Sequence, residues 1–527
     1  MKSVNFTINN LDTFAPHGTT ILDAAAGLGI SIPTLCFLNG YSHTTSCMIC
    51  VVRDIQSDRL IPSCSALVAE GMKIETGSEK VMEARKDALD LLLSEHIGDC
   101  EAPCHRACPA RMNIPLMIRQ IKNRQFKEAI VTVKKNIALP AVLGRICSAP
   151  CEKGCHRKSY DDSVSICSLK RFVADVDLAQ KSPFRPEMQS KSGKTVAVLG
   201  AGPAGLSAAF YLVQYGHTCF VYDQNPQPGG MLRYGVSEDI LPRTVLDAEI
   251  DRISDLGVEF FMEHSLGKNL EWEKLLENHD AVVVAVGTFD SELFDYTGIS
   301  LTGKGISVDR KTFETSIPGV FAGGNAVSES RMAIRALAHG KFLATSVDQF
   351  LAGNTVTGPD RRFNSMLGKV LESDIPELIK EAEGHNRVTY EGGFEKGYSK
   401  EEAALESSRC FGCDCRKPNS CKLRQYAEEY DSNQRRFHFS QRKSLIKVIQ
   451  HELVIYEPGK CIKCGLCVQI TQRAGEHLGL TFVGRGFDVR VQTPLGQPLS
   501  EGLKKVAAEC ITSCPTAALS WRDRTKE

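Results

Sequence analysis

The sequence lacks an excess of either charge, since 63 lysines and arginines balance 63 aspartates and glutamates. A neutral chain has no basic footprint for a phosphate backbone, which excludes nucleic-acid binding as its main role. An apolar run long enough to cross a bilayer is also missing. The nearest candidate, residues 196–213, is interrupted by glycines and a proline. The N-terminus shows no basic segment followed by an apolar one, so we expect no secretory signal and a cytoplasmic protein without a transmembrane segment.

Cysteine is what the sequence has in abundance, with 21 among 527 residues. Disulfides are rare in a reducing cytoplasm, so cysteines at short, repeated spacings there are expected to bind metal. The length predicts several domains, each with a core of its own. We therefore divide the chain by its cysteine groups.

Segment 1–78 begins with strand-like alternation over residues 2–9 and helical spacing over 20–30. Four cysteines follow, and four thiolates are what a [2Fe–2S] centre requires; zinc is the alternative. The stretches 18–25, 32–36 and 70–72 make the segment resemble the β-grasp ferredoxin domain of the large iron–sulfur subunit of respiratory complex I and of multimeric hydrogenases. The predicted ligands are Cys36, Cys47, Cys50 and Cys64.

Segment 79–180 contains two cysteine triads separated by an amphipathic helical stretch at 114–133. This arrangement predicts a helical adapter domain with two [4Fe–4S] clusters that share ligands across the fold. Residues 108–115 and 144–152 resemble the N-terminal domain of the glutamate synthase small subunit and its relatives, such as dihydropyrimidine dehydrogenase. The triads are Cys100, Cys104 and Cys108, and then Cys147, Cys151 and Cys155.

The adapter departs from that family at two ligand positions. The family has a fourth cysteine before the first triad, where this chain offers only His96. It also uses a Gln or Glu ligand where this chain has Lys170, and an ammonium cannot bind iron. Cys167, about one helical turn earlier, is the proposed replacement, as the fourth ligand of a cluster otherwise held by Cys108, Cys147 and Cys151. The alternatives are a surface histidine at 96 and a buried free thiol at 167.

Segment 195–352 carries a nucleotide-binding fingerprint. An apolar strand at 195–199 leads into a glycine-rich turn, a helix that ends near 215, and a second strand that ends in an acid. The glycines let the backbone approach a pyrophosphate at the helix N-terminus, and the acid binds a ribose hydroxyl. The predicted contacts are Gly200, Gly202, Ala204, Gly205 and Asp223.

Three further stretches, 228–236, 280–288 and 315–325, resemble the FAD half of the glutamate synthase small subunit. The resemblance implies FAD rather than NAD as the bound nucleotide. It also implies that the helix over 332–341 directs its N-terminal dipole at the isoalloxazine edge. The family has Asp where this chain has Asn325. The additional contacts are Gly230, Leu232, Gly287, Gly324 and Asn325.

The nicotinamide domain of that family is missing. The family inserts a second nucleotide-binding unit before the returning segment, but here only residues 289–314 occupy that place. A βαβ unit alone needs about 30 residues. No second glycine fingerprint follows a predicted strand elsewhere in the sequence.

Two more cysteine groups lie in the C-terminal part, which we divide into a connection with a cluster site, 353–430, and a ferredoxin-like domain, 431–527. The first group holds one [4Fe–4S] cluster or zinc. The second has ferredoxin-type spacing, and residues 481–487 and 514–519 again resemble the complex I subunit. The groups are Cys410, Cys413, Cys415 and Cys421, and then Cys461, Cys464, Cys467 and Cys514.

The sequence thus predicts a multidomain α/β and α+β protein with FAD, one [2Fe–2S] cluster and about four [4Fe–4S] clusters. Cys219 and Cys510 stay outside these clusters. The predicted function is electron transfer within a multisubunit anaerobic oxidoreductase complex. By family analogy the partner subunits are a molybdopterin or tungstopterin oxidoreductase of formate dehydrogenase type, a hydrogenase or a diaphorase. The alternatives are a self-sufficient NAD(P)H dehydrogenase and a non-catalytic module with a structural FAD.

Overall fold

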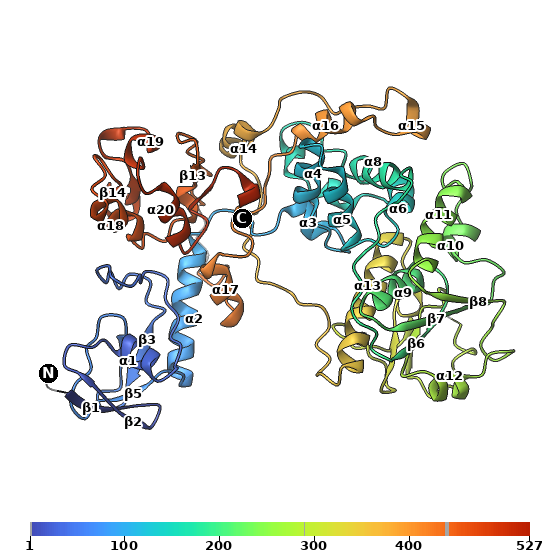
Figure 1. Cartoon of the computed structure of the whole chain (residues 1–527), viewed down its shortest axis with the longest axis horizontal. Coiled ribbons are helices and arrows are strands. Elements are labelled where there is room, and N and C mark those ends of the chain that lie inside the picture. The colour runs from blue at the N-terminus through green and yellow to red at the C-terminus, as the bar shows by residue number, and fades with distance from the viewer. Residues whose placement is uncertain (1–2, 289, 438–441, 527) are drawn as a thin grey trace. The chain divides into compact units, whose positions relative to one another are not determined.

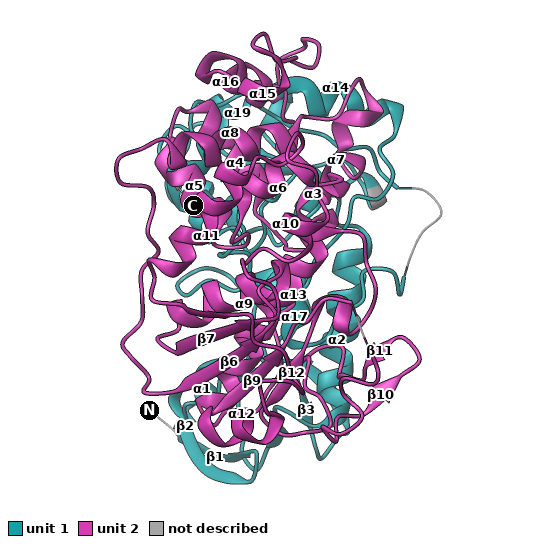
Figure 2. Cartoon of the chain, turned by 90° about the vertical axis from the view of Figure 1, so that its right-hand side faces the viewer, with its two compact units in different colours: residues 1–101, 362–380, 413–527 teal, residues 102–361, 381–412 magenta. Residues whose placement is uncertain are grey.

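The computed structural model describes residues 3–288, 290–437 and 442–526. The chain forms two compact units, each built from separate stretches of sequence (Figure 2). Unit 1 comprises residues 1–101, 362–380 and 413–527, and unit 2 comprises residues 102–361 and 381–412. Unit 2 is therefore inserted into the sequence of unit 1 at two places.

Unit 1 begins with a five-stranded mixed sheet in the order β2-β1-β5-β3-β4 (Figure 1). Strand β1 runs parallel to β5, and the other neighbours are antiparallel. Helix α1 covers the apolar core around Phe6, Ile8 and Ile74, and the Thr20 side chain caps its first turn. The elements are β1 (Ser3–Ile8), β2 (Leu11–Pro16), α1 (Ile21–Gly27), β3 (Val51–Asp54), β4 (Arg59–Pro62) and β5 (Lys73–Glu75).

The rest of unit 1 is mainly helical. Helix α2 packs against α17, and the C-terminal part encloses a core of its own between α18, α20 and the antiparallel pair β13–β16. A second antiparallel pair joins β14 to β15. The elements are α2 (Glu79–Ser94), α14 (Ile375–Leu378), α17 (Lys422–Glu429), β13 (Val454–Tyr456), α18 (Leu466–Arg473), β14 (Thr481–Val483), β15 (Arg490–Gln492), α19 (Leu499–Gly502), α20 (Ala507–Ser513) and β16 (Leu519–Trp521).

The first part of unit 2 is a helical domain, as the periodicity of 114–133 predicts. Helices α6 and α8 approach closely, because a Cβ atom at Gly144 would lie only 2.4 Å from the Cβ of Arg171. An ion pair between Arg145 and Asp175 links the same helices. The elements are α3 (Pro103–Ala107), α4 (Ile114–Lys122), α5 (Phe126–Lys134), α6 (Pro140–Ile146), α7 (Pro150–Lys153), α8 (Ile166–Leu178), α15 (Gly393–Lys396) and α16 (Lys400–Ser408).

The second part of unit 2 is a parallel five-stranded sheet in the order β12-β9-β6-β7-β8. The predicted strands at 195–199 and 218–222 are its β6 and β7. Helices α9 and α13 pack closely against each other, and Gly340 allows it because a Cβ there would lie 2.2 Å from the Ala204 carbonyl oxygen. The elements are β6 (Thr195–Leu199), α9 (Pro203–Gln214), β7 (Thr218–Asp223), α10 (Met231–Tyr234), α11 (Arg243–Ser254), β8 (Glu259–Met262), α12 (Trp272–Asn278), β9 (Ala281–Val284), β12 (Val320–Ala322) and α13 (Ala333–Leu351).

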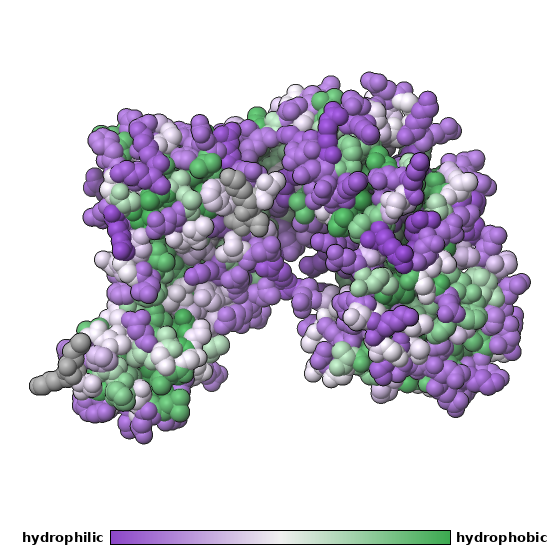
Figure 3. Space-filling view, in the orientation of Figure 1, coloured by the Kyte–Doolittle hydropathy of each residue, from purple (hydrophilic) through white to green (hydrophobic). Residues whose placement is uncertain are grey.

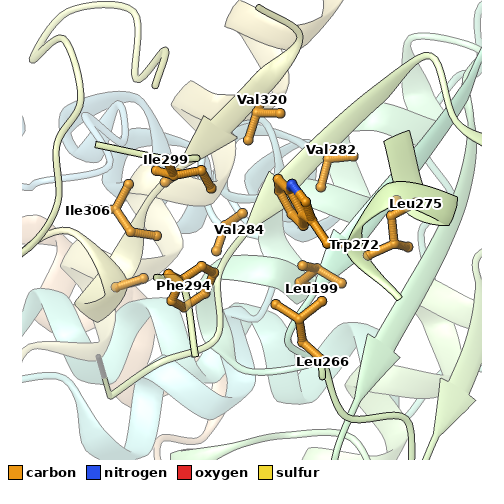
Figure 4. Close-up of a cluster of buried hydrophobic side chains, with 13 residues drawn as sticks. Leu199, Leu266, Trp272, Leu275, Val282, Val284, Phe294, Ile299, Ile306 and Val320 are labelled. Carbon is orange, nitrogen blue, oxygen red and sulfur yellow. The ribbon is translucent and has the colours of Figure 1, made fainter. Parts of the chain in front are cut away.

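A short hairpin stands between β9 and β12. Its strands are β10 (Leu301–Thr302) and β11 (Gly305–Ile306), and the described residues of this stretch contain no α-helix. Phe294 and Ile306 pack with Trp272 and with Val282 and Val284 of β9 in one apolar cluster (Figure 4). The stretch is thus absorbed into the edge of the Rossmann-like sheet.

Polar side chains are spread over the face shown in Figure 3, with apolar ones scattered between them. In the part of the chain that the structure describes, no helix combines the length and the apolar character that a bilayer crossing requires.

Candidate cluster and nucleotide sites

The four predicted [2Fe–2S] ligands come together in unit 1. Cys50 and Cys64 flank the hairpin β3–β4, and Ser63 fixes them because its N–H and hydroxyl both donate to the Cys50 carbonyl. The sulfur atoms of Cys36 and Cys47 are 3.4 Å apart. The hydrogen bond with Cys47 lowers the pKa of Cys36 to about 5, and the hydrogen bond with Cys64 lowers the pKa of Cys50 to about 7. These contacts favour the thiolate form, which binds iron, at Cys36 and Cys50.

A second four-cysteine site lies in unit 2. Cys108 follows α3, Cys147 follows α6, Cys151 lies in α7 and Cys167 in the first turn of α8. All four line one cavity. A hydrogen bond from Cys167 lowers the pKa of Cys147 to about 6. The structure therefore places Cys167 beside the three cysteines whose fourth partner the sequence leaves open.

Lys170 lines the same cavity, but its ammonium turns to the backbone. Its Nζ donates to the Leu143 carbonyl at 3.2 Å. Burial alone would lower the pKa of Lys170, yet the neighbouring sulfurs, Cys167 and Cys147 foremost, raise it. A fixed cation thus stands next to four sulfur atoms, where it would balance the negative charge of thiolates that hold a cluster.

The C-terminal group also converges within unit 1. Cys461, Cys464, Cys467 and Cys514 line one cavity with Tyr456. The loop from Cys461 to Cys467 needs left-handed backbone at Lys463 and at Gly465, the residue before α18. Burial raises the pKa of Cys461 to about 11.

Two thiols are not among these predicted ligand groups. Cys219 is fully buried in β7, and burial raises its pKa. Cys510 lies in the C-terminal core, where its sulfur is 3.9 Å from the Cys467 carbonyl oxygen.

The other predicted ligands are distributed over the two units. Cys100, Cys413, Cys415 and Cys421 belong to unit 1, whereas Cys104, Cys155 and Cys410 belong to unit 2. The predicted sets Cys100–Cys108 and Cys410–Cys421 therefore each draw on both units and stay predictions. Within unit 2, Arg157 donates to the Arg409 carbonyl and its guanidinium lies 5.2 Å from the Phe411 ring centre, so the neighbours of Cys410 contact a residue two positions after Cys155.

Among the described residues, no three His, Cys, Asp or Glu side chains are close enough to bind a single metal ion. This spacing is compatible with iron–sulfur clusters, because a cluster separates its ligands more widely than one ion does.

The glycine turn of the Rossmann-like sheet is built by close backbone contacts. A Cβ atom would lie 2.4 Å from the Ala285 carbonyl oxygen at Gly200, 1.8 Å from the Gly200 oxygen at Gly205, and 2.7 Å from the Gly202 Cα at Gly230. These positions therefore exclude any side chain. Helix α9 begins directly after Gly202 without a side-chain cap, so its first N–H groups remain available to an anion.

Asp223 stabilises this turn in addition to its predicted role toward a ribose. Its Oδ2 accepts the Ala201 N–H at 2.7 Å, and its Oδ1 accepts the Asn225 N–H at 2.9 Å. The acid at the end of β7 thus fixes the position of the loop that a pyrophosphate would meet.

The returning segment lies against the first turn of α9. A Cβ at Gly324 would be 3.0 Å from the Cβ of Ala204, and the Gly324 N–H donates to Nδ1 of His339 at 3.1 Å. Burial lowers the pKa of His339 to about 4, so the ring is neutral and accepts this bond. Asn325 accepts the Ser330 N–H at 3.1 Å. His339 is a site residue that the sequence analysis missed, since a lone histidine on a helix gives no signal.

The remaining predicted contacts surround the same turn. Leu232 is buried in α10, and Gly287, just after β9, has a left-handed φ of 84°. The predicted helix over 332–341 is the start of α13, and its Ile334 lines the cavity of the four cysteines in unit 2. One helix therefore touches both the nucleotide turn and a cluster site.

Three family models match parts of the chain. Residues 1–79 match a 2Fe–2S iron–sulfur cluster binding domain, and residues 91–182 match the 4Fe–4S domain II of dihydropyrimidine dehydrogenase. Residues 198–269 match an NAD(P)-binding Rossmann-like domain.

Curated relatives match over a part of their length. The NADPH–Fe(3+) oxidoreductase subunit beta of Geobacter sulfurreducens is 40% identical over 36% of this chain and 29% of its own. The NADP(+)-dependent formate dehydrogenase subunit beta of Moorella thermoacetica is 34% identical over 44% and 38%. The NAD-dependent dihydropyrimidine dehydrogenase subunit PreT of Escherichia coli O157:H7 is 38% identical over 38% and 50%. The chain thus spans half or less of the length of these relatives.

Proposed function

We propose that this chain is an electron-transfer subunit of a multisubunit oxidoreductase, and that it passes electrons between partner subunits through FAD and five iron–sulfur clusters. The observation that carries the proposal is the shared helix α13. The returning segment around Gly324 contacts α13 and closes the nucleotide turn. Ile334 of α13 lines the cavity of Cys108, Cys147, Cys151 and Cys167. Helix α13 would thus connect a flavin at the nucleotide turn with a cluster in this cavity.

FAD suits this Rossmann-like domain better than NAD(P). The returning segment contributes Gly324 and Asn325 to the nucleotide turn, and the short hairpin of β10 and β11 replaces a second nucleotide fold among the described residues. FAD would supply the conversion between two-electron and one-electron transfer. The backbone N–H groups at the start of α9 would hold its pyrophosphate, beside the packed pair of α9 and α13.

In unit 1, an apolar cluster provides the next part of the proposed electron path. Cys36 and Cys47 of the [2Fe–2S] site, Cys421, and Cys464 of the C-terminal site pack in one group with Leu89 and Leu466. The five-stranded mixed sheet with its covering helix supports a β-grasp ferredoxin for the first of these sites. The protein holds the clusters at fixed separations in an apolar medium, which sets their potentials.

The proposed partners follow from the names of the relatives, which are beta subunits of a formate dehydrogenase and of an Fe(3+) reductase. We therefore expect a catalytic subunit of molybdopterin or tungstopterin type, a hydrogenase or a diaphorase.

Photoreduction of the purified anaerobic chain tests the function. We expect flavin reduction by a deazaflavin donor to be followed by bleaching of the cluster absorbance, whereas NADH and NADPH leave both unchanged. Rapid bleaching by either nicotinamide would favour the self-sufficient dehydrogenase. A flavin that resists dithionite would favour a structural role.

A further inference from the structure

The stretch between β9 and β12 contacts the returning segment around Gly324 at two points. The first is Gly305 in the hairpin, where a Cβ atom would lie 2.3 Å from the Ala326 carbonyl oxygen and 3.0 Å from that of Val327. The hairpin backbone therefore lies directly against the returning segment, with no space for a side chain at this position. Ile306 and Ala326 are buried in one apolar cluster, so this contact belongs to the core of the domain (Figure 4).

The second contact is made by Phe313 through a histidine of α13. The ring centres of Phe313 and His339 are 5.1 Å apart. The same imidazole accepts the Gly324 N–H at its Nδ1. Because Phe313 is buried against the ring, it limits the positions that the imidazole can take. The backbone at Gly324 is thereby fixed by two side chains in series.

Phe313 has an unusual backbone conformation. Its φ is 60°, in the left-handed region that a bulky residue rarely adopts. Its N–H donates to the Asp309 carbonyl at 2.9 Å, and its own carbonyl accepts the N–H of Ala322, the last residue of β12, at 3.1 Å. Oδ1 of Asp309 also accepts the N–H groups of Lys311 and Thr312. A strained aromatic residue that is held in place by its surroundings points to a function for its position.

The two contacts lie on either side of a predicted nucleotide contact. Asn325 follows Gly324, which is held by His339, and precedes Ala326, which lies against Gly305. The backbone is therefore fixed both before and after Asn325. A side chain presented to a bound nucleotide from this position is preorganised by its two neighbours.

We infer that residues 301–313, which we call the clamp segment, position the returning segment for FAD. Gly305 and Phe313 are its two contact points, and His339 joins the second contact to Gly324. All three are positioning residues, which act on FAD through Gly324 and Asn325. The inference rests on the proposed binding of FAD and assigns a role to the short stretch that stands in place of a second nucleotide-binding unit.

Substitutions in the hairpin test the first contact in the intact chain, with iron content as the check on folding. Gly305→Ala should weaken FAD binding by more than about tenfold, because its methyl group would meet the Ala326 oxygen and displace the returning segment. The matched control is Gly303→Ala in the same hairpin, where a Cβ meets no atom within 4 Å and the affinity should not change. Titration of flavin-depleted protein with FAD, followed by flavin fluorescence, measures the dissociation constants. Wild-type affinity in Gly305→Ala would overturn the first contact.

Variants of His339 test the second contact and leave the hairpin unchanged, which matters because a φ of 143° also strains any side chain at 305. His339→Leu removes the acceptor of the Gly324 N–H, whereas His339→Asn keeps an acceptor near the position of Nδ1. We expect His339→Leu to bind FAD about three- to tenfold more weakly and to shift the flavin reduction potential, and His339→Asn to restore both. Unchanged affinity and potential in His339→Leu, or no recovery in His339→Asn, would refute this role.

A double variant tests whether Phe313 acts through His339. Phe313→Ala should weaken FAD binding, and Phe313→Ala with His339→Leu should be no weaker than His339→Leu alone. Independent, multiplying losses would show that the two side chains do not act in series. A wild-type chain that holds its clusters but does not bind FAD would instead refute the flavin in the proposed function, whereas a wild-type chain that binds FAD with all variants unaffected would refute the clamp segment alone.

Discussion

Lys170 occupies a position where a ligand is expected, and Cys167 is the nearby side chain that can replace that ligand. An ammonium at 170 cannot bind iron, and the structure directs it to the Leu143 carbonyl. Cys167, in the first turn of the same helix, lies beside Cys147 instead. Residue 170 thereby contributes a positive charge to the site and no ligand atom.

Replacement of Cys167 by alanine should remove or destabilise one [4Fe–4S] cluster. Three thiolates remain, and the nearest other side chain, Lys170, cannot complete the set. We expect a loss of about four iron atoms and of one paramagnetic signal on reduction, with FAD retained. Cys219→Ala, which removes a buried thiol outside the clusters, is the control and should keep all the iron. An unchanged spectrum in Cys167→Ala would mean that the fourth ligand comes from elsewhere.

Replacement of Lys170 by methionine should lower the reduction potential of the same cluster. Removal of a buried cation next to four thiolates makes the addition of an electron less favourable, by on the order of 50 mV if about 1 kcal/mol of attraction is lost. A redox titration followed by electron paramagnetic resonance measures this shift. Lys127→Met, at an exposed position of α5, should leave the potential unchanged. An equal potential in Lys170→Met would show that the ammonium does not act on the cluster.

At the scale of elements, α11 holds the start of α6 through a buried carboxylate. Oε2 of Glu249 accepts the Val142 N–H at 2.9 Å, one of the donors that a helix N-terminus leaves unpaired. Burial raises the pKa of Glu249 from 4.5 to about 7, although the charge of Lys134 opposes the shift. The contact between the two helices is therefore sensitive to pH.

Glu249→Gln should remove this sensitivity. A carboxyl group with a raised folded pKa contributes stability that is complete below pH 4.5 and is lost as the pH rises through about 7. The glutamine oxygen accepts the same N–H without a charge, so the variant should gain up to about 3 kcal/mol over the wild type between those pH values. Calorimetric unfolding at pH 6 and 8.5 measures the difference, and Glu273→Gln on the exposed face of α12 is the control. A difference that does not grow with pH would contradict the assignment.

The elements of the nucleotide domain could be predicted from the sequence because their signals are local. The apolar run at 195–199, the glycines that follow it and the acid at 223 lie within one βαβ unit, and the structure folds them as β6, α9 and β7. His339 could not be found in this way, since its bond to Gly324 joins a helix to a distant turn.

At the scale of the whole molecule, the discontinuous units divide two of the cysteine groups that the sequence spacing predicts. Cys100 and Cys104 stand on either side of the boundary between Glu101 and Ala102, and Cys410 and Cys413 stand on either side of the boundary after Gly412. Motifs that look like single clusters in the sequence are therefore divided between units. The Cys415 contact with Cys100 spans more than 300 residues of sequence and leaves no local pattern.

The total iron content of the intact chain tests these ligand assignments together. With His96 as a ligand, the cysteines other than Cys219 and Cys510 are sufficient for one [2Fe–2S] and four [4Fe–4S] clusters. We therefore expect roughly 18 iron atoms and as many acid-labile sulfides per chain in an anaerobic preparation, without zinc. Elemental analysis together with sulfide determination measures both. Stoichiometric zinc with about four fewer irons would assign one four-ligand site to zinc, as the close spacing of Cys410 to Cys421 allows. Because His96→Cys should leave the iron count unchanged and Cys167→Ala should lower it by about four, the two variants distinguish a replaceable ligand from an essential one within the same total.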